Sequence, residues 1–299
     1  MRSSAAGLGL AALLLLAPTL SFGYDPQVHQ RLTFFAAKAL NRCLEGGDIP
    51  PLTPLQVRFI ATSNMGLANS NPLVRFFRWS YFDAADGGSR KFLWLVNTRF
   101  SEHFEQLVMQ LQNTADEAER YQDLGRIVSY VQLVSSPPRA LPVYSARFWR
   151  WNFSDRFDRY RLDEAALQAA LAADCQFLAE PPESYQEILQ AVAADTVNAV
   201  RAPMDGLPTT WEPFWTPGNS AGEFGAYGPA GNNFGRKAEF RCSADTAKRC
   251  VLLKNDPLYA EFALHRQLAA VRGTAQAMYL FQRQANAAAL NNHGGQHAE

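Results

Sequence analysis

The spacing of apolar residues along the chain predicts a mostly helical fold. Apolar side chains recur every three or four residues in seven segments, which is the repeat of one face of an α-helix. Proline marks several segment ends, because it is favoured in the first turn of a helix and disrupts a helix interior. The predicted helices span residues 25–44, a segment that begins at Thr53 and Pro54, and residues 99–121, 124–134, 163–178, 182–200 and 257–290.

One stretch, residues 203–235, interrupts this helical pattern. It holds twelve Gly or Pro residues, a density that is incompatible with regular helix or sheet. Its six aromatic side chains favour packing against an apolar surface. The sequence leaves two alternatives open, a functional lid and a structural wrap. The aromatic residues are Trp211, Phe214, Trp215, Phe224, Tyr227 and Phe234.

The first 23 residues have the pattern of a secretory signal peptide. Arg2 supplies a positive charge, residues 7–17 are apolar, and Pro18 is followed by small residues at positions 21 and 23. This pattern predicts cleavage before Tyr24 and an exported protein, either periplasmic or secreted. The alternative is an uncleaved anchor, although the apolar stretch is shorter than the roughly 20 residues that span a bilayer.

The chain has four cysteines, an even number that suits an oxidising compartment. Four cysteines allow three pairings. Cys242 and Cys250 enclose a polar turn between two short apolar segments, which favours a disulfide-bonded hairpin and leaves Cys43 to pair with Cys175. A zinc site made of these cysteines is disfavoured, because no two of them have the C-x2-C spacing.

Charge and composition narrow the function classes further. The 299 residues carry 28 Lys or Arg and 28 Asp or Glu, a balance that argues against binding of duplex nucleic acid through its phosphates. The apolar fraction of 47% argues against disorder. We expect one all-α domain over residues 24–290, with a loop and hairpin insert at residues 203–255 and a flexible tail at residues 291–299.

Three stretches resemble the zinc-dependent phospholipase C and single-strand-specific nuclease superfamily. The first begins Tyr-Asp-Pro-Gln-Val-His at residues 24–29. The second is Arg-Phe-Phe-Arg-Trp-Ser-Tyr-Phe-Asp at residues 75–83, and the third is Leu-Gly-Arg-Ile-Val-Ser-Tyr-Val-Gln-Leu-Val-Ser-Ser-Pro-Pro-Arg at residues 124–139. The resemblance implies that superfamily's all-α fold, in which an aromatic N-terminal residue binds zinc through its amine and carbonyl, with a nearby histidine.

The same resemblance implies that most metal ligands are missing. Tyr24 and His29 remain as remnant ligands. Zinc requires deprotonated nitrogen, sulfur or oxygen donors, so a two-donor remnant predicts no bound cofactor and no catalytic residue. The alternative is a zinc site altered to use Tyr24, His29 and nearby acids. The positions that the resemblance assigns to lost ligands are Ser80, Ser129, Leu133, Arg139 and Ser145.

Arg139 suggests a different use for the same cleft. A buried guanidinium favours a bidentate oxygen partner, so the cleft could hold an anion. The alternative is that Arg139 pairs internally with Asp155 or Asp158. We expect residues 203–235 to cover this cleft beside Ser129 and Arg139.

Residues 147–161 form the densest run of arginine and aromatic residues in the chain. Such a run could stack bases, contact anionic lipid headgroups or form an interface, or else be an internal turn with Arg–Asp pairs. The leading hypothesis is an exported, non-catalytic binding or interaction protein. Its partner would be an anionic small molecule, a lipid headgroup or another envelope protein. The alternatives are a metal-dependent phosphoesterase and a purely structural envelope protein.

Overall fold

A computed structural model describes residues 24–68, 82, 100–141, 143, 155–218, 225–243 and 247–295. The predicted signal peptide and the candidate positions Ser80 and Ser145 lie outside these residues. Within them the chain is mainly helical, and the one sheet has two strands, so the mainly-α class predicted from the apolar spacing is confirmed.

The described chain forms the following elements. The α-helices are α2 (Pro26–Leu44), α3 (Pro54–Ala68), α5 (Phe100–Asn113), α6 (Glu117–Leu133), α7 (Pro137–Ala140), α9 (Glu164–Leu171), α10 (Tyr185–Arg201) and α11 (Pro257–Gly295). Two 3-10 turns, η2 (Phe157–Arg159) and η3 (Gln176–Leu178), and two strands, β1 (Ala238–Arg241) and β2 (Arg249–Leu252), complete them.

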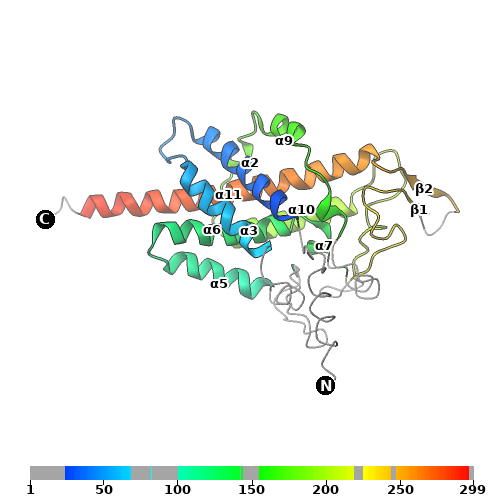
Figure 1. Ribbon diagram of the computed structural model, residues 1–299, viewed down its shortest axis with the longest axis horizontal. Coiled ribbons are helices and arrows are strands. Elements are labelled where there is room, and N and C mark those ends of the chain that lie inside the picture. The colour runs from blue at the N-terminus through cyan, green and yellow to red at the C-terminus, as the bar shows by residue number, and fades with distance from the viewer. Residues whose placement is uncertain are drawn as a thin grey trace, which may run out of the picture.

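Helix α6 lies at the centre of the helical body, and α11 runs along the full length of that body (Figure 1). Helices α3, α5, α10 and α11 all pack against α6, and α2 packs against α3 and α11. Glycines at two positions allow close approach between helices. A Cβ at Gly125 would lie 2.4 Å from the backbone oxygen of Ile60, and a Cβ at Gly273 would lie 2.7 Å from Val192. Any larger residue would force these helices apart.

The helix boundaries correct several predictions. The predicted helix 99–121 is wrong, because the break lies at residues 114–116 and α6 runs unbroken through Tyr121 and Leu124. Asp116 causes this by accepting a hydrogen bond from the backbone N–H of Glu119, which starts α6. That helix stops at Leu133, and Pro137 begins α7.

Two other predicted helices change length. The helix predicted over residues 163–178 ends at Leu171 and continues only as the turn η3. In contrast, α11 extends to Gly295, five residues past its predicted end at Leu290 and into the segment expected to be a tail. No helix in the described ranges is both long enough and apolar enough to cross a membrane.

The described part of residues 203–235, here called the aromatic loop, packs down on the helical body, as its aromatic content predicts. Trp215 stacks on Phe262 of α11 with ring centroids 5.9 Å apart, and Trp211 lies 4.4 Å from the same ring. Phe234 contacts Phe157 at 5.2 Å. In its described part this segment makes only isolated bridges and no regular strand.

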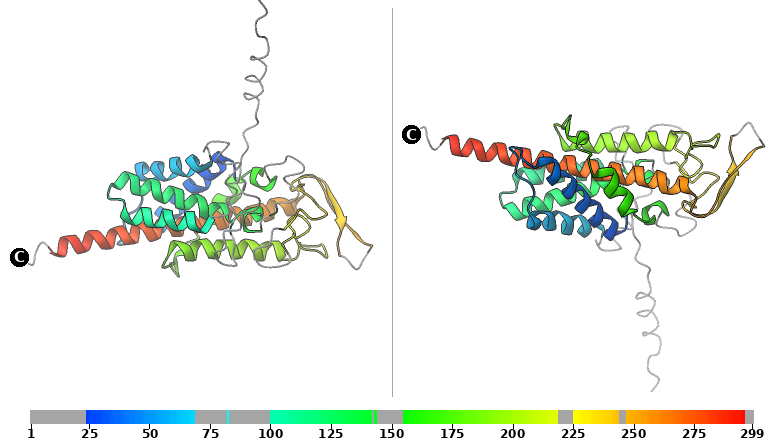
Figure 2. Two further views of the ribbon diagram at one scale, coloured as in Figure 1. Left: turned by 90° about the horizontal axis from the view of Figure 1, so that it is seen from below. Right: turned by 90° about the horizontal axis from the view of Figure 1, so that it is seen from above.

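Strands β1 and β2 form an antiparallel hairpin that projects from one end of the molecule, while the C-terminus lies at the other (Figure 2). Both predicted disulfides are confirmed. Cys242–Cys250 closes the hairpin with Cα atoms 5.1 Å apart, and Cys43–Cys175 joins the end of α2 to the start of η3 with Cα atoms 5.7 Å apart. The bond supplements the burial of Phe240 and Leu252, because a two-stranded hairpin on its own is only marginally stable in water.

Candidate functional site: a neutral polar core and a basic pocket

Tyr24 is completely buried where the first described residues meet the end of α6. Its hydroxyl shares a hydrogen bond with Ser135 Oγ at 3.1 Å, and its ring lies edge-on to His29 with centroids 5.7 Å apart. Burial raises the pKa of Tyr24 far above its usual value. The side chain is therefore a neutral hydroxyl engaged in core packing.

His29 belongs to a network of neutral polar side chains between α2, α3, α6 and α11. Its Nδ1 donates to Gln132 Oε1 at 2.6 Å, and Asn64 Nδ2 donates to the same oxygen at 2.9 Å. Gln132 Nε2 donates to Thr33 Oγ1 at 3.1 Å and to Thr274 Oγ1 at 3.2 Å. This pattern fixes the amide orientation, because reversing Gln132 would set its NH2 group against the donor of Asn64.

The surroundings of His29 keep its imidazole neutral. Burial is the main cause that lowers its pKa from 6.5 to about 4, while the hydrogen bond with Gln132 acts in the opposite direction. The positive charge of Arg139, itself buried in α7, lowers the pKa further. A second cation at this place is therefore electrostatically unfavourable.

These residues do not fit a zinc ion. The groups around His29 are amides and hydroxyls, whereas zinc prefers imidazole, thiolate and carboxylate donors. Ser129 is buried on α6 and Leu133, which has no donor atom, is half-buried at its end. Among the described residues there is no group of three or more His, Cys, Asp or Glu that could hold a metal.

Asp155 and Asp158, the acids assigned to the possible cleft, both accept hydrogen bonds from other parts of the fold. Asp158 Oδ1 accepts a hydrogen bond from Ser136 Oγ at 2.5 Å. Asp155 accepts three, from the backbone N–H of Phe157 at 2.8 Å, Trp215 Nε1 at 3.0 Å and the hydroxyl of Tyr227 at 2.7 Å. The described part of the aromatic loop therefore contacts Asp155 and Phe157 as well as Phe262 of α11, and its predicted position over Ser129 and Arg139 stays a prediction.

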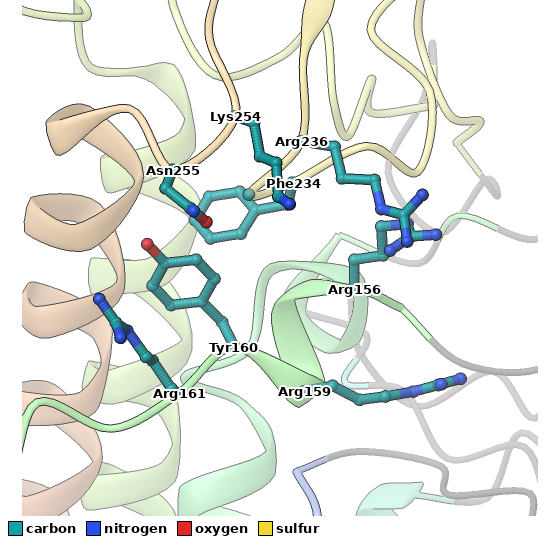
Figure 3. Close-up of a pocket in the computed structure, with 9 residues that line it drawn as sticks. Arg156, Arg159, Tyr160, Arg161, Phe234, Arg236, Lys254 and Asn255 are labelled. Atoms are coloured by element: carbon teal, nitrogen blue, oxygen red, sulfur yellow. The ribbon is translucent and has the colours of Figure 1, made fainter.

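A pocket of about 330 Å³ lies beside η2, at the end of the molecule that carries the hairpin (Figure 3). Five of its nine lining residues are Arg or Lys, and none is Asp or Glu. Two aromatic rings, those of Tyr160 and Phe234, form part of its wall. The lining residues are Arg156, Arg159, Tyr160, Arg161, Phe234, Gly235, Arg236, Lys254 and Asn255.

Backbone hydrogen bonds hold two of these cations in place. The N–H of Arg156 donates to Asn232 Oδ1 at 2.9 Å, which ties η2 to the aromatic loop. The N–H of Arg236 donates to the carbonyl of Asn233 at 2.8 Å, and its own carbonyl accepts from the hydroxyl of Tyr259 at 2.8 Å. The chain is therefore organised around the pocket before any ligand arrives, which lowers the entropy cost of binding.

Gly235 shapes the wall of this pocket. Its φ of +76° lies in the left-handed region, and a Cβ there would come within 3.0 Å of the Tyr160 ring. Tyr160 packs edge-on against Phe234 with centroids 5.2 Å apart. Only glycine allows the backbone to approach the ring this closely, so the aromatic wall depends on it.

The charges in the pocket repel one another. Burial lowers the pKa of Arg156, and the neighbouring charges of Arg236 and Arg159 lower it further, against the opposing effect of Asp155. In Figure 3 the side chains of Arg156 and Arg236 come from opposite sides and their guanidinium ends converge. No ion pair within the described part of the chain involves any of the five cations. An anion would relieve this repulsion.

The amino-acid sequence alone indicates part of this site. The described end of the arginine-aromatic run supplies Arg156, Arg159 and Arg161, while Asp155 and Asp158 of the same run are buried. Arg236 and Lys254 were missed, because they lie about 80 residues or more further along the chain. The signal that could have found them is the excess of Lys and Arg in and beside the predicted hairpin.

Comparison of the chain with protein-family models, with curated proteins and with solved structures finds no match.

Proposed function

We propose that this protein is an exported, non-catalytic binding protein whose ligand is a multiply charged oxyanion held in the basic pocket. The observation that carries the proposal is a 330 Å³ pocket lined by five cationic side chains and no carboxylate. Guanidinium groups form paired hydrogen bonds with phosphate and similar anions. Neutralising several clustered cations favours a ligand with two or more negative charges.

The polar core supports the non-catalytic part of the proposal. In our proposal the chain keeps the helical framework of the zinc-dependent phospholipase C and nuclease superfamily and replaces its metal centre. Neutral contacts of His29 with Gln132 and the adjacent charge of Arg139 are poor surroundings for zinc. The signal-like N-terminus supports export, with which the two disulfides are compatible.

Calorimetric titration of the purified protein with inorganic triphosphate tests the binding site. We expect saturable binding that weakens as salt is added, because exposed charges are screened. The double variant Arg156→Gln, Arg236→Gln should bind at least tenfold more weakly, since each hydrogen bond to a charged group contributes about 1.5–3 kcal/mol. Arg58→Gln, on the exposed side of α3, is the matched control. Absence of wild-type binding, or equal loss in the control, would contradict the proposal.

Metal content and hydrolysis are measured on the same preparation. We expect no stoichiometric zinc and no cleavage of a chromogenic phosphodiester, with or without added zinc. The alternative of an altered zinc site makes the opposite prediction. One zinc per chain, lost in the variant His29→Asn, would support that alternative and refute the non-catalytic proposal.

A further inference from the structure

The hairpin exposes an apolar strip on its outer face. Val251 and Leu253 are 43% and 61% exposed, although the hairpin's other apolar positions, such as Phe240 and Leu252, are buried against the body. Alternate residues of a strand point to opposite faces, and Val251 is on the exposed face of β2. Leu253 directly follows the last residue of β2 and is exposed as well, so these two residues form the apolar strip. Single exposed apolar residues are ordinary, but two neighbours on a projecting hairpin form a candidate contact surface.

The chain segments that form the hairpin end are rich in positive charge. Residues 155–161 and 235–255 hold nine Lys or Arg against four Asp or Glu, in a chain whose formal net charge is zero. Two of the acids, Asp155 and Asp158, are buried, and a third, Glu239, is paired with Arg249 at 2.5 Å. These two segments therefore carry an excess of positive charge at the hairpin end, where the basic pocket also opens.

The combination of apolar residues and cations favours an anionic lipid bilayer over a soluble anion as the binding partner. A soluble anion would neutralise the pocket but leave Val251 and Leu253 in water. The interface of an anionic bilayer satisfies both requirements, because apolar side chains enter the acyl boundary while Lys and Arg remain with the headgroups. The hairpin projects beyond the first turn of α11 at the end of the molecule, so it can reach a flat surface without a clash from the helical body (Figures 1 and 2).

We infer that the hairpin end docks on an anionic membrane surface, with Val251 and Leu253 inserted and a lipid phosphate in the basic pocket. This inference rests on the proposed function for the pocket ligand. In this arrangement the hairpin anchors the protein by inserting its apolar side chains, and the pocket binds the lipid headgroup.

Vesicle sedimentation tests the inference on the full-length mature protein. Vesicles of phosphatidylglycerol and phosphatidylcholine in equal parts should bind the protein, and vesicles of phosphatidylcholine alone should not. The double variant Val251→Ser, Leu253→Ser should lose about tenfold or more in vesicle affinity, because it removes the two apolar side chains that insertion into the bilayer would bury. Its titration with inorganic triphosphate should equal that of the wild type. Leu290→Ser is the matched control, since Leu290 is 66% exposed on α11, far from the hairpin.

The two experiments separate the inference from the proposed function. If the wild type binds triphosphate but not anionic vesicles, or if the hairpin variant binds vesicles as well as the wild type, the membrane inference is overturned and the anion site stands. If the wild type binds no triphosphate, the anion site itself fails. Equal loss of vesicle binding in Leu290→Ser would also overturn the assignment of the hairpin as the anchor.

Discussion

Acidification should destabilise this protein through a single buried side chain, His29. Its pKa is about 4 in the folded protein and 6.5 in the unfolded chain. Between these two values the unfolded state binds a proton at His29 and the folded state does not. Above about pH 6.5 the titration of His29 costs the folded protein no stability. The free energy of unfolding falls as the pH drops from 6.5 towards 4, and below that value His29 reduces it no further.

The magnitude follows from the size of the pKa shift. One pKa unit corresponds to about 1.4 kcal/mol, so the shift of His29 predicts a loss of about 3 kcal/mol in the free energy of unfolding. The structural cause is that a protonated ring would be buried beside Arg139, in a network whose other members are neutral. Such a loss is a large part of the 5–15 kcal/mol that is typical of whole domains.

Urea denaturation at several pH values between 4 and 7.5 measures this effect. The variant His29→Asn keeps a donor for Gln132 and cannot titrate, so its stability should fall less steeply with acid than that of the wild type. The difference between the two curves isolates His29 from the carboxylates, which both proteins share. His265→Gln, which removes an exposed imidazole from α11, is the control and should keep the wild-type dependence. Parallel wild-type and His29→Asn curves would refute the reasoning.

Three further predictions concern the elements around the pocket and the body. Replacing Cys43 and Cys175 by alanine should lower the stability by up to about 5 kcal/mol, because the bond closes a loop of 132 residues; unchanged denaturation midpoints would contradict this. Gly235→Ala should lower the free energy of unfolding by about 1–2 kcal/mol in thermal unfolding, because alanine is strained at a positive φ. It should also weaken triphosphate binding measured by calorimetry, because the added Cβ displaces Tyr160. Asp155→Asn should lower the stability by about 2–3 kcal/mol in urea, because the carboxylate accepts three hydrogen bonds, and a neutral result would argue against its anchoring role.

Local sequence signals predicted the presence of the helices more accurately than the residues at which they begin and end. The apolar repeat found the main helices, and the helix predicted from residue 25 begins at Pro26, where Asp25 accepts a hydrogen bond from the backbone N–H of Gln27. The same repeat missed the break before α6. That break depends on the side chain of Asp116, which accepts a hydrogen bond from the backbone N–H of Glu119, and the spacing of apolar residues gives no information about such a polar contact. Capping residues would have given the correct boundary.

The partner of His29 shows why site prediction was harder. The resemblance drew attention to Ser129 and Leu133, but the residue that contacts His29 is Gln132. Consecutive residues of a helix point about 100° apart, so the rotation of α6 decides which of them faces α2. A glutamine within the apolar run of α6 was the signal available in the sequence, because a buried amide needs partners.

The sequence by itself determined the helical class, the irregular aromatic loop and the hairpin, since each depends on contacts between residues close in the chain. It also predicted both disulfides, because the short spacing of Cys242 and Cys250 left only one other pair. Only the tertiary structure brought Arg156 beside Arg236 and buried His29 among neutral amides. Those arrangements depend on how distant segments pack, and packing is set by the summed burial of the whole core and by no local pattern.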